Sequence, residues 1–203
     1  MGNKNFLDIN IIGKSQGIRR QLEFIYKVAN SDKNILILGE TGIGKELTAK
    51  MIHKLSCRKY KPFVVINCGN IPEELFEAEL FGFERGSFTG AIKEKIGLLE
   101  IAHDGTVFLD EIGDLSPHHQ AKILRIIEKR EMRRIGETAI RKIYARFIFA
   151  TNKNLKEEVK KGRFRRGLYY RINIVSFHIP SLREKKKDIP LLVSYIFIKK
   201  RIV

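Results

Sequence analysis

Short runs of apolar, β-branched residues alternate with longer stretches of helical spacing along this 203-residue chain. The runs are bounded by turn residues, as buried strands are, whereas the longer stretches repeat apolar side chains every three or four residues. Because strand and helix alternate, we predict an α/β fold of three layers, with a mostly parallel five-stranded sheet between two layers of helices. The predicted strands are residues 34–38, 63–66, 106–109, 145–150 and 172–179, and the predicted helices are residues 46–55, 73–81, 118–128 and 155–161.

Two weaker patterns complete the organisation. A short hairpin is predicted at residues 132–143, where Gly136 and Thr138 supply turn chemistry. After Pro180 the chain becomes highly charged and then continues into an apolar segment at residues 189–198. That segment is shorter than the roughly 20 residues that span a bilayer, so we expect a packed helix. The predicted units are an α/β core at residues 1–180, and a linker with the start of a truncated helical lid at residues 181–203.

Charge is distributed unevenly. Residues 1–110 hold 15 basic and 14 acidic side chains, whereas residues 111–203 hold 24 and 9, so nearly all of the net charge of +16 lies in the second half. A basic half could meet nucleic acid or an acidic neighbouring subunit. Its charges are scattered and are not interleaved with aromatic residues, so a solvated lysine-rich surface is an equal alternative.

Few residues suggest a disulfide, a metal site or a targeting signal. The chain has two cysteines, Cys57 and Cys68, which is too few for a disulfide framework or a zinc site. His118 and His119 point to different sides of a predicted helix and have no His or Cys partner at ligand spacing, so we interpret them as exposed polar residues. The N-terminus has no signal or lipidation pattern, and we expect a cytoplasmic protein with no membrane segment.

A glycine-rich segment follows the first predicted strand. Four residues separate Gly39 from Gly44 and Lys45, and a predicted helix begins there. Such a loop exposes backbone N–H groups to phosphates, the helix N-terminus adds partial positive charge, and the lysine reaches the outer phosphates. Position 46 is Glu, so the Ser or Thr that ligates Mg²⁺ in the usual P-loop motif is missing. The predicted phosphate-binding residues are Gly39, Glu40, Thr41, Gly42, Ile43, Gly44, Lys45 and Glu46.

Polar side chains also end two later predicted strands. Asp110 and Glu111 follow one strand, where Asp110 can hold Mg²⁺ and Glu111 can orient the attacking water. Two acidic residues are also common at the N-terminus of a helix. The presence of a P-loop motif in the same chain is what favours a role in hydrolysis. Asn152 follows the next strand and is predicted to sense the γ-phosphate, with an Asx turn as the alternative. The pattern therefore predicts a site for ATP and Mg²⁺.

From about residue 11 to residue 192 the chain resembles the AAA+ domain of bacterial sigma-54-dependent transcription activators. That family also carries Glu after the P-loop lysine, as Glu46 does here. The resemblance implies a P-loop NTPase fold of the AAA+ type, a hexamer-like ring and, as partners, the sigma-54 factor and RNA polymerase. The other matching motifs lie at residues 62–63, 67–68, 79–82, 86–91, 108–114, 150–152 and 168–173.

The most diagnostic match is a loop framed by two glycines. The resemblance implies that this loop grips sigma-54, with Phe88 and Thr89 at its tip. From the residues alone, a plain surface turn is the simpler interpretation. Ser87 stands where the family usually has Ala. The predicted sigma-54 contact comprises Gly86, Ser87, Phe88, Thr89, Gly90 and Ala91.

The resemblance assigns roles to three further residues. It implies that Asn67 restrains Glu111 until the loop engages, whereas the sequence alone suggests only a strand-end cap. Arg165 and Arg171 match positions that reach the γ-phosphate of a neighbouring subunit, although in so basic a segment either could be a surface residue. An arginine supplied in this way contributes roughly 10³–10⁵ in rate, so hydrolysis would need a ring.

Three functions are compatible with these patterns. The first is an ATPase core that couples hydrolysis to remodelling of sigma-54 RNA polymerase for promoter opening. The second is a truncated remnant that binds nucleotide or joins related rings. It is favoured by the end at Val203, inside the expected lid, and by Arg166 and Gly167, which replace a usual acidic pair. The third is another AAA+ remodeller, against which the Phe-Thr loop argues. We expect no DNA-binding domain in this chain.

Overall fold

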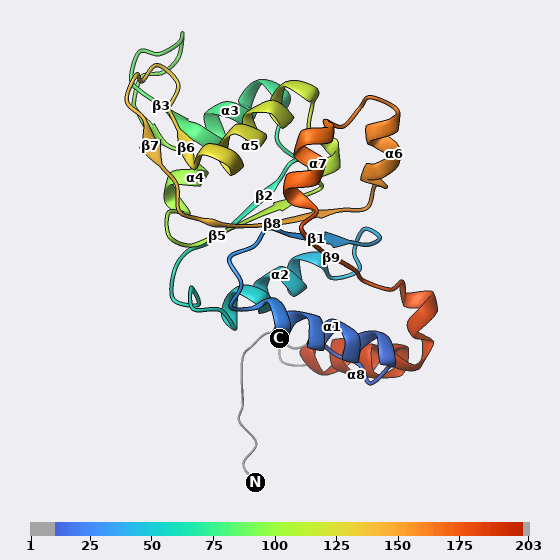
Figure 1. Ribbon diagram of the computed structural model, residues 1–203. Coiled ribbons are helices and arrows are strands. Elements are labelled where there is room, and N and C mark those ends of the chain that lie inside the picture. Colours follow the sequence, from blue (N-terminus) through green and yellow to red (C-terminus); the bar gives the residue numbers. More distant parts are fainter. Residues whose placement is uncertain (1–10, 201–203) are drawn as a thin grey trace.

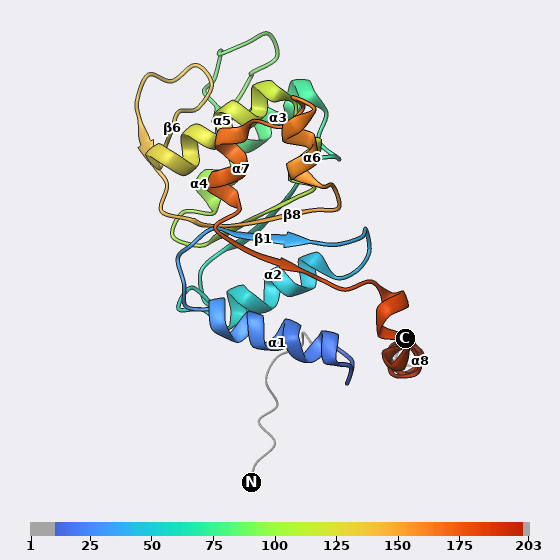
Figure 2. The same ribbon diagram turned by 45° about the vertical axis from the view of Figure 1, so that its right-hand side comes forward.

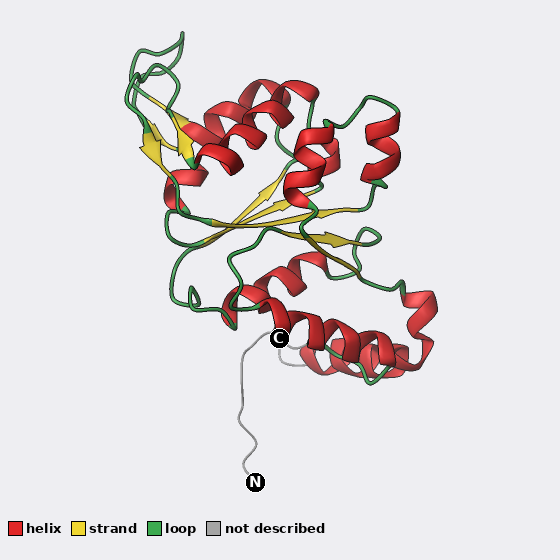
Figure 3. Cartoon of the chain, viewed as in Figure 1, coloured by secondary structure: helices red, strands yellow, loops and turns green. Residues whose placement is uncertain are grey.

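A single parallel sheet runs through the centre of the protein in the computed structural model, which describes residues 11–200 (Figures 1 and 3). Its strands lie in the order β2-β5-β8-β1-β9, and every neighbouring pair is parallel. The predicted five-stranded α/β architecture is therefore confirmed. The strands are β1 (Ile35–Leu38), β2 (Phe63–Asn67), β5 (Thr106–Asp110), β8 (Arg146–Thr151) and β9 (Val175–His178).

Helices cover both faces of this sheet, which explains why its central strands β1, β5 and β8 are buried over almost their whole length. One face packs on α1 (Gln16–Val28) and α2 (Lys45–Lys54) through a core that includes Ile25, Ile37 and Ile52. The opposite face has the larger core (Figure 1). Its helices are α3 (Glu73–Phe81), α4 (Leu98–Ile101), α5 (Pro117–Lys129), α6 (Leu155–Lys160) and α7 (Arg166–Ile172).

The sequence analysis did not predict α1, although its local signals are clear. The side chain of Ser15 accepts a hydrogen bond from the backbone N–H of Ile18 and so caps the first turn. At the other end, the buried guanidinium of Arg146 donates to the carbonyls of Val28 and Ala29. These bonds satisfy carbonyls that a helix C-terminus leaves unpaired, so Arg146 fixes α1 against the sheet.

The last predicted strand was too long at its N-terminal end. Residues up to Ile172 belong to α7, and β9 begins only at Val175. Leu168 and Ile172 are four residues apart, so they lie on one face of α7, and both are buried. Ile172 is helical because this face of α7 is buried, although the apolar residues around it are also typical of a strand.

Two small antiparallel hairpins meet at one end of the molecule, at the upper left of Figure 1. Strand β3 (Gly82–Phe83) pairs with β4 (Lys95–Ile96), and β6 (Glu131–Met132) pairs with β7 (Arg141–Lys142). The second hairpin confirms the one predicted at residues 132–143. A single bridge between Phe83 and Ile135 joins the two hairpins.

The C-terminal segment lies on the same side of the sheet as α1. A 3₁₀ segment, η2 (Leu182–Asp188), leads into α8 (Ile189–Lys200), and Figure 2 shows both beyond one end of α1. The expectation of a packed α8 was wrong for much of the helix, because its main contact is with η2 and Phe197 is 67% exposed. Within the described residues, no helix has the length and apolar character needed to cross a bilayer. Residues 1–10 and 201–203 of the two predicted units lie outside the described residues.

Candidate nucleotide site

The predicted P-loop connects the end of β1 to the start of α2. Gly42 and Gly44 have φ angles of 76° and 101°, in the left-handed region that favours glycine. Lys45 begins α2, and its side chain folds back over the loop. Its ammonium lies 3.3 Å from the carbonyl oxygen of Gly39 and 3.0 Å from Glu111 Oε1. The loop therefore presents a buried cation at the N-terminus of a helix, which is a favourable place for phosphate.

The two acidic residues lie directly beside this cation. Asp110 is the last residue of β5, and Glu111 follows it in a left-handed conformation with a φ of 50°. Glu111 pairs with Lys45 through Oε1 and accepts a hydrogen bond from the backbone N–H of Asn152 through Oε2, at 3.2 Å. The carboxyl edges of β1, β5 and β8 thus place Lys45, Asp110, Glu111 and Asn152 together, as expected for adjacent parallel strands.

Asn152 connects this acidic pair to the P-loop. Its side-chain amide donates to Thr41 Oγ1 at 3.0 Å. These side chains surround a cavity of about 520 Å³, which also has Gly69, Asn70 and Asp114 in its wall. The last three were not predicted as site residues. The predicted residues that line the cavity are Thr41, Gly42, Gly44, Lys45, Glu46, Asn67, Asp110, Glu111 and Asn152.

The electrostatics of the cavity suit a divalent cation. Burial raises the pKa of Asp110, and the charges of Glu111 and Glu46 raise it further, whereas a backbone hydrogen bond and Lys45 act against the rise. Because burial disfavours the charged carboxylate, a cation beside Asp110 would stabilise its ionised form. Carboxylate oxygens are also the ligands that Mg²⁺ prefers, so the residues present fit this ion.

Asn67 lines the same cavity but does not contact Glu111 as the family resemblance implied. Its side-chain oxygen accepts a hydrogen bond from the backbone N–H of Gly69 at 3.1 Å. Glu111 is bonded to Lys45 and Asn152 instead. In this structure Asn67 is therefore the local strand-end cap that the sequence alone suggested.

A second, largely apolar cavity of about 510 Å³ adjoins the other side of the P-loop. Ile11 and Ile43 contribute to its wall, together with Leu182 from η2 and Leu192 from α8. Arg183 of η2 forms an ion pair with Glu40, so η2 is tied to the P-loop. An apolar recess beside a phosphate-binding loop suits the base of a nucleotide. Apart from Glu40, Thr41, Gly42, Ile43 and Gly44, its wall was missed by the sequence analysis.

The two predicted arginine fingers lie outside both cavities. Arg165 precedes α7, where its backbone N–H donates to Gln120 and its side chain donates to the carbonyl of Pro117. Arg171 lies in the last turn of α7 and pairs with Glu128 at 3.0 Å. Both side chains are exposed, so neither reaches the phosphate site of its own chain.

The predicted sigma-54 loop is a closed turn between β3 and β4. Gly86 donates to the carbonyl of Ala91 at 2.8 Å, and both Gly86 and Gly90 have positive φ angles. Phe88 is 45% exposed, and its ring lies edge-on to Phe83 with 4.9 Å between centroids. The tip therefore carries an aromatic side chain that is only partly held by the protein.

A buried arginine connects the stems of this loop to the second hairpin. Arg134 contacts Glu100 through two hydrogen bonds of 2.9 Å each, and it also pairs with Glu84 at 3.0 Å and Glu94 at 3.4 Å. Glu84 and Glu94 flank the loop on either side. Because one guanidinium joins three carboxylates, it orients both stems of the loop.

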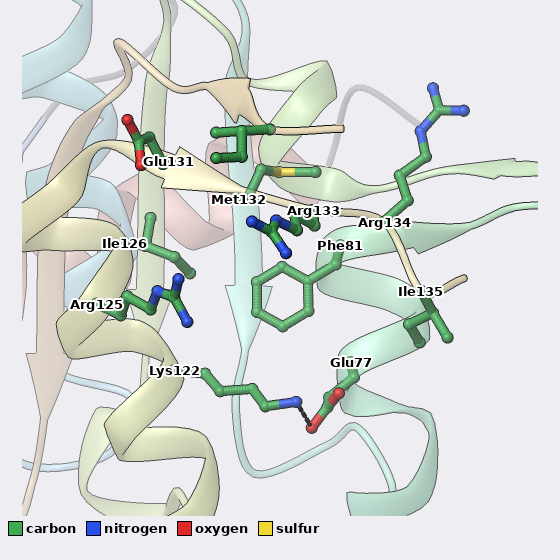
Figure 4. Close-up of a pocket in the computed structure, with 11 residues that line it drawn as sticks. Glu77, Phe81, Lys122, Arg125, Ile126, Glu131, Met132, Arg133, Arg134 and Ile135 are labelled. Carbon is green, nitrogen blue, oxygen red and sulfur yellow. Dashed lines mark ion pairs between the residues drawn. The ribbon is translucent and has the colours of Figure 1, made fainter. Parts of the chain in front are cut away.

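Another cavity, of about 340 Å³, lies at the base of the two hairpins between α3 and α5 (Figure 4). Phe81, Ile126 and Met132 form part of its apolar wall, and Lys122 and Glu77 face each other at its edge. None of the predicted site residues lines it.

The sequence is similar to that of a known protein family and of several transcription regulators. A family model described as the Sigma-54 interaction domain matches residues 11–178. The Nif-specific regulatory protein of Herbaspirillum seropedicae is 48% identical over 193 residues, which is 95% of this chain and 36% of that protein. The transcriptional regulatory protein XylR of Pseudomonas putida is 47% identical over 184 residues, which is 91% of this chain and 32% of that protein. The chain thus spans about a third of the length of these relatives.

The fold is also similar to that of a protein whose structure has been solved. NtrX from Brucella abortus in complex with ADP has a TM-score of 0.87 and 36% sequence identity, covering 93% of this chain and 42% of that chain. The complex of the same protein with ATP has a TM-score of 0.86 and covers 92% of this chain.

Proposed function

Because the chain belongs to the family of sigma-54 interaction domains, a family of AAA+ P-loop NTPases, we propose that it binds and hydrolyses ATP to remodel sigma-54 RNA polymerase for promoter opening. The observation that carries this proposal is the convergence of Lys45, Asp110 and Glu111 on one cavity beside the P-loop. The structures of NtrX with ADP and with ATP support a nucleotide in this fold.

In the proposed complex, the P-loop N–H groups and Lys45 hold the phosphates. Asp110 holds Mg²⁺, either directly or through water, and Glu46 cannot replace the missing hydroxyl ligand in the same geometry. Bound Mg²⁺ would offset the negative charge of the phosphates. The apolar cavity beside Ile11, Ile43 and Leu182 holds the base.

Glu111 is the residue that we propose to orient the attacking water. In the structure its carboxylate is engaged by Lys45. A triphosphate would offer Lys45 a more highly charged partner, and Glu111 would then be free to accept a hydrogen bond from water. Asn67 and Asn152 lie in the same cavity wall. We propose that Asn152 senses the γ-phosphate. We also propose that Asn67, whose side chain is bonded to Gly69 in this structure, restrains Glu111 once ATP is bound and until the loop engages.

Completion of the site requires a second copy of the chain. Arg165 and Arg171 are exposed and lie outside their own cavity. In a ring, α7 of one subunit can present them to the γ-phosphate bound by its neighbour, and an arginine supplied in this way is worth roughly 10³–10⁵ in rate. A hexamer-like ring would therefore hydrolyse ATP, whereas an isolated subunit would do so very slowly.

A short path leads from the phosphate cavity to the loop that is proposed to contact sigma-54. Asn67 ends β2, α3 begins six residues later, and α3 leads through β3 into the loop. Arg134 holds both stems of that loop. A change at the γ-phosphate can thus displace α3 and the loop together, which would couple nucleotide state to the partner.

Turnover measured as a function of protein concentration tests the enzymatic part of this proposal. We expect ATPase activity per subunit to rise steeply with concentration, because the arginines must come from a neighbour. Nucleotide binding without turnover at every concentration would support the alternative, a regulator that binds ATP or joins related rings. Turnover that is independent of concentration would exclude the role of the neighbour.

Crosslinking to the sigma-54 factor in the presence of a transition-state analogue of ATP tests the partner. Phe88→Ala should abolish the crosslink, because it removes the aromatic tip. Tyr60→Ala is the matched control, since Tyr60 is another exposed aromatic residue, at 89% exposure, and lies outside the loop. A crosslink that survives Phe88→Ala would exclude the aromatic tip as the contact, and no crosslink in the unaltered chain would favour a different target.

A further inference from the structure

Two histidines and a glutamate come together outside the nucleotide site, where α3 meets α5. His118 and His119 are in the first turn of α5, and Glu77 lies in the middle of α3. Glu77 Oε1 is 2.9 Å from His118 Nε2 and 4.0 Å from His119 Nε2. One ligand atom from each residue lies within 4.8 Å of the others. The interpretation of both histidines as exposed was wrong for His119, which is only 5% exposed.

We propose that Glu77, His118 and His119 form a binding site for a divalent transition-metal ion of the zinc class. Two imidazoles and one carboxylate are a common protein ligand set for zinc, with a fourth position left for water. Ligand atoms at about 2.0–2.1 Å from a tetrahedral ion lie about 3.4 Å from one another. The two separations from Glu77 Oε1, 2.9 and 4.0 Å, bracket this value, and the histidine ligand atoms lie within 4.8 Å of each other, so side-chain rotations would complete the site.

The surroundings of His119 hold its ring in place for this role. Its Nδ1 lies 3.2 Å from Ser116 Oγ, which can accept a hydrogen bond in the tautomer that leaves Nε2 free. Metal-bound histidines typically donate their second ring nitrogen in this way. The ring also packs against Phe76, with 4.5 Å between centroids. His118 is 65% exposed and can adjust to the ion, whereas His119 is fixed.

Lys122 already binds the carboxylate of Glu77 that the metal would bind. Its ammonium forms an ion pair with the same oxygen of Glu77 (Figure 4). Lys122 is one helical turn beyond His118 on α5, so all the groups concerned lie along one seam between the two helices. A dipositive ion held by two further ligands would displace the single ammonium charge. Removal of that ammonium should therefore strengthen metal binding.

A metal at this seam would add a link between two helices that the ion pair of Lys122 with Glu77 already joins. Helix α3 continues directly into β3 and the loop at residues 86–91. The bridge would restrain α3 relative to α5 and so stiffen the base of that loop. This consequence can be measured apart from any nucleotide chemistry.

Calorimetric titration of the 203-residue chain with Zn²⁺ tests the proposal, with excess Mg²⁺ present to occupy the carboxylates of the nucleotide cavity. The protein should carry no added histidines. We expect one equivalent of Zn²⁺ to bind, and His118→Gln and Glu77→Gln to weaken its affinity at least about tenfold, as loss of metal-site groups does. Lys122→Met should tighten binding. Hydrogen exchange of the α3 amides should slow when Zn²⁺ is added.

Two variants serve as matched controls. His103→Gln removes an exposed histidine that lies 3.8 Å from Asp104, and Cys57→Ser removes an exposed thiol. Both should bind Zn²⁺ as the unaltered chain does. Equal Zn²⁺ affinity in the unaltered chain, His118→Gln and Glu77→Gln would overturn the proposal, as would loss of the binding in Cys57→Ser. Because His118 is exposed, its substitution leaves the core intact, and unchanged circular dichroism would verify this.

Discussion

Glu111 is held by two contacts that tie three strand ends together. Its carboxylate pairs with Lys45 after β1 and accepts from the backbone of Asn152 after β8, while its own residue follows β5. A left-handed φ at a residue other than glycine carries a conformational cost, and such strain concentrates at functional sites. The two contacts and the left-handed backbone fit the role in hydrolysis that we propose for Glu111.

Glu111→Gln separates binding from hydrolysis. The amide keeps the shape of the side chain but cannot act as a base, so we expect ATP hydrolysis to fall about 10²–10⁴-fold. ATP affinity should remain or increase, because Lys45 loses a competing carboxylate. Steady-state ATPase assays and equilibrium nucleotide binding measure the two effects. Glu74→Gln, an exposed change on α3, is the control, and unchanged hydrolysis in Glu111→Gln would contradict the assignment.

The residues of the phosphate site could be predicted from the sequence because each lies at or just after the end of a predicted strand. Parallel neighbours bring such positions to one edge, so Lys45, Asp110 and Asn152 had to lie near one another once the strand order was as found. The wall of the apolar cavity could not be predicted in this way. Ile11 and Leu182 are distant in the sequence and carry no motif, so only the folded chain brings them together.

At the scale of elements, Asp188 fastens η2 to the start of α1. Its carboxylate accepts hydrogen bonds from the backbone N–H groups of Lys14 and Ser15, at 2.7 and 2.9 Å, and from the Ser15 hydroxyl. Burial alone would raise the pKa of Asp188, but these hydrogen bonds outweigh it and lower the pKa. The ionised carboxylate is therefore the form that stabilises this junction.

Asp188→Asn should lower the free energy of unfolding by about 1–3 kcal/mol at pH 7, because the amide cannot accept the same set of bonds. The folded pKa lies below the unfolded value of about 3.9. The contribution of Asp188 is thus present above about pH 4 and is lost as the pH falls through the folded pKa. Urea unfolding at pH 7 and at about pH 3 measures it. A difference between variant and unaltered chain that grew as the pH fell would contradict this account.

Most long elements could be predicted, whereas boundaries set by tertiary contacts could not. The predicted helix at residues 73–81 coincides with α3, because its apolar spacing and flanking Pro72 and Gly82 are local signals. The two-residue strands β3 and β4 exist only because they pair with each other. Similarly, Ile172 joins α7 rather than β9 because the helical face is buried.

At the scale of the whole molecule, the site and its proposed arginine fingers belong to different parts of the surface. Lys45 lies in the cavity between β1 and α2, whereas Arg171 is exposed on α7 and Arg165 is exposed directly before it. The excess of positive charge in residues 111–203 includes these arginines. An acidic or nucleotide-bearing face of a second copy is therefore a natural partner for this surface.

Mixing two inactive variants tests this arrangement. Lys45→Ala keeps Arg171 but lacks the ammonium group that binds phosphate. Arg171→Ala keeps that ammonium group but lacks the arginine that would reach the neighbouring site. In an equal mixture that assembles at random, about one quarter of the interfaces join an intact site to an intact arginine. We expect ATPase activity to recover toward that fraction. A mixture as inactive as its components would contradict a contribution from the neighbouring subunit.

The central claim is that Lys45, Asp110 and Glu111 act on a single bound triphosphate. The affinity of Lys45→Ala for ATP with Mg²⁺, measured by calorimetry, tests it most directly, with Lys27→Ala as a control for loss of one exposed positive charge. We predict at least about a tenfold loss of affinity in Lys45→Ala, since a charge-assisted contact to phosphate is removed, and no change in Lys27→Ala. Unchanged ATP affinity in Lys45→Ala would contradict the account.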